Sequence, residues 1–139
     1  MIKKYLSLFL ICLFFYFVLS LINSSGQEKV YKATIDTDGV QRIEIIADSY
    51  YFDPNHIIVK INTPVEFKVK KTGIIVPHNI VMAEPDAGIT FREDLSRESK
   101  IIKFTPKKGG KFKFYCDKKL LFFESHREKG MEAILEVVE

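Results

Sequence analysis

Residues 104–116 read FTPKKGGKFKFYC and contain the pattern that decides the fold. The Pro-Lys-Lys-Gly-Gly segment predicts a reversal of the chain, because proline presets φ and glycine permits positive φ. After the reversal, Phe112, Phe114 and Cys116 occupy every second position, and they alternate with Lys111, Lys113 and Tyr115. Such alternation is typical of a strand with one apolar and one solvated face. The stretch therefore predicts a strand that ends on an inward-facing thiol.

Similar short segments follow one another along most of the chain, separated by Pro, Gly, Asn and Asp. Val65, Phe67 and Val69 repeat the alternation, with charged residues between them. Seven strands are predicted, over residues 42–47, 56–61, 65–70, 78–82, 100–105, 111–116 and 132–138. Residues 87–97 hold too few apolar positions for an amphipathic helix and are expected to form mainly loop. Strands of this length and spacing favour an all-β sandwich.

The amino-terminal segment carries an export signature. Lys3 and Lys4 precede residues 5–22, an apolar run of 18 residues without a charged side chain. This length lies between a typical signal-peptide core and a membrane span, so residues 1–26 are either a signal peptide or a retained membrane anchor. Both alternatives predict an N-terminal apolar helix and an exported protein, periplasmic or otherwise extracytoplasmic, that is soluble or anchored to the cytoplasmic membrane through residues 5–22.

A single domain follows the export segment, because 139 residues leave no room for a second core. Residues 27–39 are polar, end in an Asp-Gly turn signal and are interpreted as a linker, which places the domain at residues 40–139. The formal net charge of +3 falls to +1 when residues 1–26 and their two lysines are left out. So small a charge argues against a nucleic-acid-binding protein.

The domain contains one cysteine, Cys116, so it cannot form an internal disulfide. Exposed thiols oxidise readily outside the cytoplasm, and metal ligation is a common way to keep one useful. His126 and Met131 follow Cys116 in order, and His78 stands upstream after a proline. Two imidazoles, a thiolate and a thioether form a donor set suited to copper. Zinc also accepts two imidazoles and a thiolate, but gains little from methionine.

Several motifs in combination resemble the cupredoxin family, which includes plastocyanins and azurins. They are Phe52-Asp53-Pro54, Thr63-Pro64-Val65-Glu66-Phe67, Pro77-His78-Asn79 and residues 104–116, within a resemblance that covers residues 40–138. The resemblance implies a Greek-key β-sandwich that binds one copper ion through His78, Cys116, His126 and Met131. It also implies that Asn79 ties the two ligand-bearing loops together by hydrogen bonds.

The ligand loop departs from the family pattern. Nine residues separate Cys116 from His126, where single-copper members place only a few, and the loop has no second cysteine for a two-copper centre. Leu120, Leu121, Phe122 and Phe123 form an apolar quartet in this loop. Two interpretations stay open: the quartet packs onto the sandwich end, or it is an exposed patch where a redox partner docks. His56, the remaining histidine, is expected to be a surface residue far from the site.

The resemblance implies a monomeric electron carrier rather than an enzyme, one that shuttles a single electron between exported or membrane-bound redox partners. Two alternatives remain. One is a copper-binding or copper-delivery protein without electron transfer, expected if the long loop makes the ion exchangeable. The other is a small copper enzyme in which an open coordination position admits a substrate.

Overall fold

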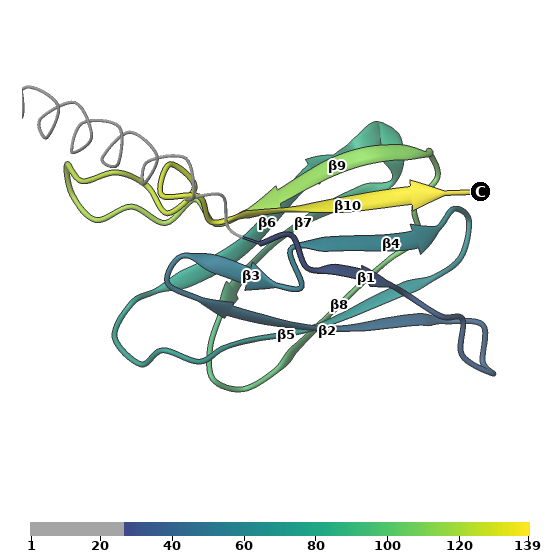
Figure 1. Ribbon diagram of the computed structural model, residues 1–139, viewed down its shortest axis with the longest axis horizontal. Coiled ribbons are helices and arrows are strands. Elements are labelled where there is room, and N and C mark those ends of the chain that lie inside the picture. The colour runs from purple at the N-terminus through teal and green to yellow at the C-terminus, as the bar shows by residue number, and fades with distance from the viewer. Residues whose placement is uncertain (1–26) are drawn as a thin grey trace, which may run out of the picture.

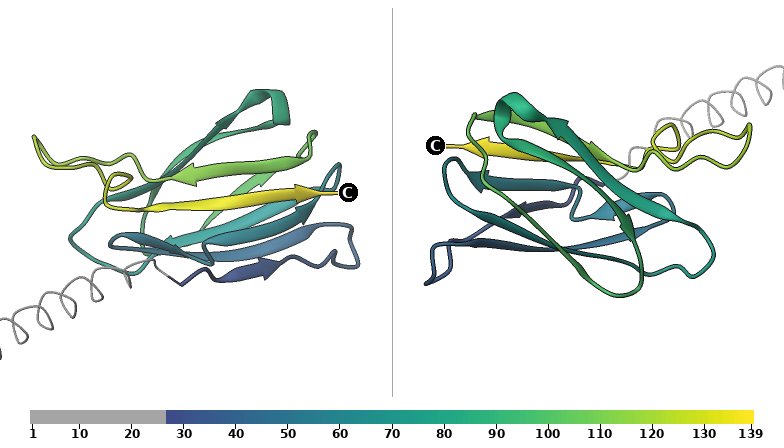
Figure 2. Two further views of the ribbon diagram at one scale, coloured as in Figure 1. Left: turned by 45° about the horizontal axis from the view of Figure 1, so that its top comes forward. Right: turned by 180° about the vertical axis from the view of Figure 1, so that it is seen from behind.

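Two β-sheets packed face to face make up the computed structural model, which describes residues 27–139 (Figures 1 and 2). The first sheet has six strands, in the order β1 (Val30–Lys32), β4 (His56–Lys60), β10 (Glu132–Val138), β9 (Gly110–Tyr115), β6 (His78–Glu84) and β7 (Ile89–Leu95). The second has four, in the order β3 (Tyr51–Asp53), β2 (Gln41–Asp48), β5 (Val65–Lys71) and β8 (Lys100–Phe104). One 3₁₀ turn, η1 (Pro85–Ala87), precedes β7. The predicted all-β sandwich is confirmed.

The core lies between the sheets and follows the predicted alternation. Val65, Phe67 and Val69 of β5 are buried, whereas Glu66 is half-buried and Lys68 is exposed. The ring of Phe67 contacts Phe104 of β8 and Phe114 of β9, with centroids 5.0 and 5.9 Å apart. Aromatic side chains from both sheets therefore join the two layers at this point.

All seven predicted strands are present, but three strands of the described chain were missed. The expectation of a loop over residues 87–97 is wrong, because β7 pairs with β6 along its whole length, from His78 opposite Leu95 to Glu84 opposite Ile89. The strand lies at the edge of its sheet, and its charged residues, Arg92, Glu93 and Asp94, are partly or fully exposed. Ile89, Phe91 and Leu95 face the core at alternate positions, but Glu93 interrupts this apolar face, so the sequence carries only a weak periodic signal.

Strand β1 lies within residues 27–39, which were expected to form a linker. It pairs in parallel with β4, Val30 opposite His56, and its three side chains are exposed. The sheet therefore begins before residue 40. The sequence did not predict this strand, because an exposed edge strand shows no alternation of apolar and polar residues. The predicted N-terminal helix, residues 1–26, falls outside the described residues. Among residues 27–139, no helix is long and apolar enough to span a membrane.

Three neighbouring strands converge at one end of the sandwich. Strand β6 begins there at His78, β9 ends there at Tyr115, and β10 begins there opposite Tyr115. The loop between β9 and β10 projects beyond the sheets at this end (Figure 1). We call this end, residues 72–78 and 116–131, the ligand pole.

Candidate metal centre

Backbone hydrogen bonds fold the long loop back onto the end of β9. The N–H of Cys116 donates to the carbonyl of Met131 over 3.0 Å, and the N–H of Met131 donates to the carbonyl of His126 over 2.9 Å. The N–H of His126 donates to the carbonyl of Lys118 over 2.8 Å. The base of the loop is thus closed, which returns His126 to the side of Cys116 although nine residues separate them.

The donor atoms of three predicted ligands meet at the ligand pole. The Sγ of Cys116 lies 3.4 Å from Nδ1 of His126 and 4.0 Å from Nδ1 of His78. The two Nδ1 atoms are 3.2 Å apart, and all three residues are buried. Ligands about 2.0–2.3 Å from one ion stand roughly 3–4 Å from each other, so this spacing fits a single metal ion.

Met131, the fourth predicted ligand, is fully buried at the start of β10. Its carbonyl accepts the hydrogen bond from Cys116, so its backbone lies directly beside the thiol. Met131 shares the inward face of the chain with Ala133, Leu135 and Val137, which are also buried. Two imidazoles, a thiol and a nearby thioether form a soft donor set that fits one copper ion.

Burial determines the protonation state of the metal-free site. It raises the pKa of the Cys116 thiol, although the N–H of Asn79 points at the sulfur from 3.4 Å. Burial, and secondarily the neighbouring His126, lowers the pKa of His78 to about 4. Burial also lowers the pKa of His126. At neutral pH the site therefore holds two neutral imidazoles ready to ligate and a thiol that must lose its proton to a bound metal.

The low pKa of His78 predicts that the metal-free protein loses stability in mild acid. The unfolded chain binds this proton near pH 6.5 and the folded chain only near pH 4, so the free energy of unfolding falls as the pH drops through this interval. Between pH 7 and pH 5 we expect His78 to account for a loss of about 2 kcal/mol. Urea unfolding of wild type and of His78→Gln gives the free energy of unfolding of each protein at pH 7 and at pH 5. The wild type should lose about 2 kcal/mol more than the variant between the two pH values. Equal losses of stability in the two proteins would contradict this role of His78.

Asn79 joins the two elements that carry His78 and Cys116. Its side chain donates to Oδ1 of Asp117 over 2.8 Å and accepts from the N–H of Asp117 over 3.1 Å. Arg92 of β7 holds the same carboxylate with two hydrogen bonds, and this pairing lowers the pKa of Asp117. Arg92 was missed from the sequence, since no pattern around it points to the site.

Aromatic and hydroxyl side chains from the segment before β3 cover the histidines. The ring of Tyr50 lies edge-on to His126, with centroids 4.8 Å apart, and Lys129 lies 4.5 Å above the Tyr50 ring. The Oγ of Ser49 is 3.3 Å from Nε2 of His78. That contact engages the far ring nitrogen and leaves Nδ1 facing the sulfur. Nothing in the sequence around residue 50 suggested this role.

The apolar quartet of the ligand loop is exposed, so the packing interpretation is wrong. The exposed fractions of Leu120, Leu121, Phe122 and Phe123 are 65, 77, 84 and 52%. The N–H of Phe123 donates to the carbonyl of Leu120 in a local turn, and the middle of the loop extends away from the sheets (Figure 1). A hollow of about 340 Å³ beside it is lined by residues that include Tyr50, Ile75, Phe123 and His126. The imidazole of His126 therefore borders an apolar opening to the surface.

His56 lies apart from the donor cluster, but the expected surface position is wrong. Its side chain is 8% exposed, Nδ1 lies 2.5 Å from Oε1 of Glu28, and Nε2 lies 2.7 Å from Oε2 of Glu136. Glu28 belongs to the segment before β1 and Glu136 to β10. His56 thus connects the start of the described chain to the centre of the six-stranded sheet.

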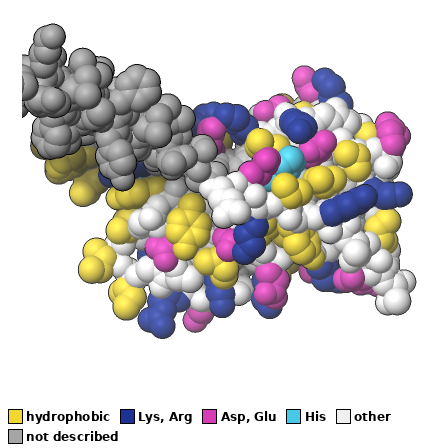
Figure 3. All heavy atoms as spheres, in the orientation of Figure 1, with side chains coloured by type: hydrophobic (Ala, Val, Ile, Leu, Met, Phe, Trp, Pro, Cys, Tyr) yellow, Lys and Arg dark blue, Asp and Glu magenta, His cyan; other side chains and the backbone are white. Residues whose placement is uncertain are grey.

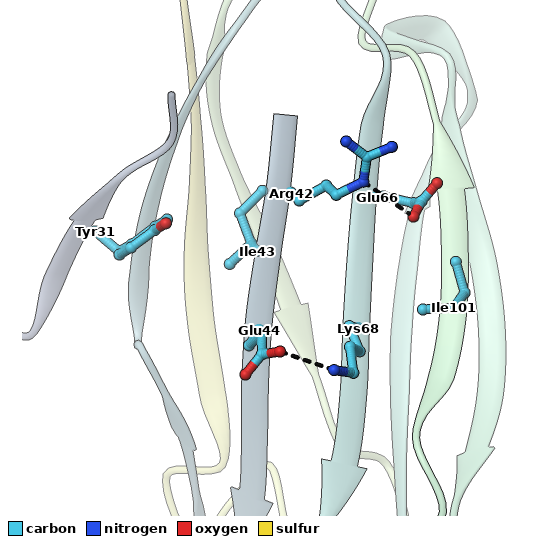
Figure 4. Close-up of a pocket in the computed structure, with 7 residues that line it drawn as sticks. All are labelled: Tyr31, Arg42, Ile43, Glu44, Glu66, Lys68 and Ile101. Carbon is cyan, nitrogen blue, oxygen red and sulfur yellow. Dashed lines mark hydrogen bonds and ion pairs between the residues drawn. The ribbon is translucent and has the colours of Figure 1, made fainter. Parts of the chain in front are cut away.

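A second hollow, of about 480 Å³, lies against β2, β5 and β8 (Figure 4). Its charged side chains already pair with one another: Glu44 lies 2.8 Å from Lys68, and Arg42 lies 3.5 Å from Glu66. Paired charges leave little for a ligand to bind, so the donor cluster at the ligand pole is the better candidate site.

The fold agrees with a match to a known protein family. The model of the cupredoxin-like domain family matches residues 9–130. The chain belongs to the cupredoxin-like family. No curated protein matches the chain at a significant level.

Several solved structures resemble this cupredoxin-like protein. The Cu(I)-bound metal-binding domain of the Cu(I)-exporting P-type ATPase CopA from Streptococcus pneumoniae has 26% identity and a TM-score of 0.62, covering 82% of this chain and 100% of that domain. The solution structure of an apo copper-binding protein has 21% identity and a TM-score of 0.58, covering 81% and 100%. Auracyanin A, a blue copper protein from Chloroflexus aurantiacus, has 18% identity and a TM-score of 0.55, covering 72% and 100%. The latter two likenesses concern the fold alone.

Proposed function

We propose that this cupredoxin-like protein binds one copper ion through His78, Cys116 and His126, with Met131 as a weak axial ligand, and carries one electron between exported or membrane-bound redox partners. The observation that carries the proposal is the convergence of three buried donor atoms, all within 4.8 Å of one another. Copper, when bound, supplies the Cu(I)/Cu(II) couple. Imidazole serves both oxidation states, and thiolate favours Cu(I).

The protein restrains the ligands so that little has to move when the charge changes. His78 and Cys116 lie at strand ends, and the Asn79–Asp117 hydrogen bonds join those ends directly. The N–H of Asn79 also orients the sulfur of Cys116. His126 borders the apolar hollow, so we assign it as the route by which the electron leaves. A partner then needs only to approach the ligand pole.

A second candidate function is the binding and delivery of Cu(I) without electron transfer. The likeness to the metal-binding domain of a Cu(I)-exporting ATPase favours it, at 26% identity over the whole of that domain. The long ligand loop also supports it, because residues 119–123 are all exposed and not packed over the ion. A small copper enzyme with an open coordination position is the third alternative.

Spectroscopy of the full chain, loaded with Cu(II) in detergent, tests the proposal. We expect an intense thiolate-to-copper charge-transfer band and a small copper hyperfine splitting in the paramagnetic spectrum, because a short thiolate bond delocalises the unpaired electron onto sulfur. Weak colour together with rapid loss of metal to a chelator would contradict electron transfer and support delivery. A spectrum that changes when small anions are added would contradict it in favour of an enzyme.

A further inference from the structure

The chain enters the domain at the ligand pole. Val30, the first residue of β1, lies opposite His56 of β4, and His56 also lies opposite Ile134 of β10. Strand β10 starts directly after Met131, so the start of β1 is only two strands away from the start of β10 at the same end. Whatever precedes residue 27 therefore leaves the domain on the side that carries the donor cluster.

The residues before β1 are held against the domain. The side chain of Asn55 accepts a hydrogen bond from the N–H of Lys29 over 2.6 Å and donates one to the carbonyl of Gln27 over 3.3 Å. The ammonium group of Lys29 lies 2.8 Å from the carboxylate of Asp53. Together with the Glu28–His56 contact described above, these bonds fix the chain from Gln27 onward.

Little chain is left between this fixed point and the apolar run. The run ends at Ile22, so residues 23–26 alone connect it to Gln27. Four residues reach at most about 14 Å when fully extended. If the run stays in a bilayer, the side of the domain from which the chain leaves is held within about that distance of the membrane surface.

The same pole presents unpartnered apolar side chains on two loops. Ile74 and Ile75 are 75 and 92% exposed, and Leu121 and Phe122 are 77 and 84% exposed. We call these four residues the loop tips. The space-filling view shows hydrophobic side chains gathered at this end of the molecule (Figure 3). Lys118, Lys119 and Lys129 line the hollow between the two loops. Aromatic and aliphatic side chains beside lysines are typical of segments that lie in the interface of an anionic membrane.

We propose that residues 5–22 are retained as a membrane anchor and that the loop tips insert into the interface of the same bilayer. The short connection favours the bilayer over a protein as the surface that the loop tips contact, because it holds the chain exit within about 14 Å of the membrane. The lysines then lie at the level of the lipid headgroups. The inference is independent of copper chemistry, and it confines any partner of His126 to the same membrane surface.

Tryptophan fluorescence of the full chain in vesicles tests this orientation, because the chain has no tryptophan of its own. The variant Phe122→Trp places a reporter at a loop tip. Ile35→Trp is the matched control, because Ile35 is 48% exposed and lies far from the ligand pole. Ile35 pairs with Gln41, and Gln41 pairs with Val65, the first residue of β5, at the opposite end of the sandwich. In phosphatidylcholine–phosphatidylglycerol vesicles with brominated acyl chains, we expect a blue shift and loss of emission for Phe122→Trp and neither change for Ile35→Trp.

Flotation of the same vesicles separates the two parts of the proposal. A chain that does not float with the vesicles would overturn the retained anchor. A chain that floats but keeps its full Phe122→Trp emission would overturn insertion of the loop tips. Adding Lys118→Gln and Lys119→Gln should restore part of the emission in phosphatidylglycerol-containing vesicles, and equal quenching would contradict the role of the lysines. None of these readouts involves copper, so they do not depend on the copper-binding proposal.

Discussion

Replacing Cys116 with serine should abolish the thiolate-to-copper band of the loaded protein and weaken copper binding by more than about 100-fold. Loss of a residue that only supports a ligand already costs roughly 10–100-fold in metal affinity, and Cys116 is proposed to be a ligand itself. Its sulfur is the one thiol among the described residues, and it lies within 4.0 Å of both imidazole nitrogens. Absorption spectra and competition with a copper chelator measure both effects.

The Cys116→Ser variant should still fold. Serine is slightly smaller, and its hydroxyl can accept the hydrogen bond that the N–H of Asn79 gives the sulfur. His56→Gln is the matched control, because it replaces a buried histidine that lies outside the donor cluster. This variant should leave the band unchanged. A band of normal intensity in a folded Cys116→Ser protein would refute the assignment of the thiolate. A band lost in both variants would trace the effect to folding instead.

Replacing Phe67 with alanine should have the largest effect on stability, a loss of about 3–5 kcal/mol in the free energy of unfolding. Phe67 is fully buried and contacts aromatic rings from β8 and β9. Its removal leaves a cavity between the sheets where the two layers meet. A domain of this size has only about 5–15 kcal/mol of stability, so the urea midpoint of the metal-free protein should fall severely.

Phe122→Ala is the control for this substitution, because it deletes the same side chain at a position that is 84% exposed. We expect its free energy of unfolding in detergent solution to stay within about 0.5 kcal/mol of wild type. If Phe67→Ala costs less than about 1 kcal/mol, the ring does not hold the two sheets together. If the two variants lose equal stability, the ligand loop packs more closely in solution than its exposure indicates.

The position of the ligand pole connects the proposed function with the inferred orientation. His126 borders the hollow between the two loops, and Ile75 and Phe123 line the same hollow. An anchored domain with its loop tips in the interface would present this opening close to the membrane surface. In that position, membrane-bound redox proteins are the partners that can reach His126.

Side-chain alternation determined most of the sandwich from the sequence alone. Successive side chains of a strand point to opposite faces of the sheet. Phe112 and Phe114 of β9 could therefore be assigned to the core without knowledge of the neighbouring strands, and so could Val65 and Phe67 of β5. The same parity placed Cys116 and Met131 on inward faces. The chemistry of a thiol, two imidazoles and a thioether then predicted a copper site, and His78, Cys116 and His126 do meet.

Tertiary structure alone decided what lies around those residues. Tyr50 and Arg92 lie far from Cys116 in the sequence, and only the packing of the strands brings them to the site. Burial of His56 between two glutamates depends on strand β1, whose exposed edge position leaves no periodic pattern. Periodicity reports how a residue faces its own strand, a local property of the backbone, whereas contacts between distant segments depend on which strands become neighbours when the whole chain packs.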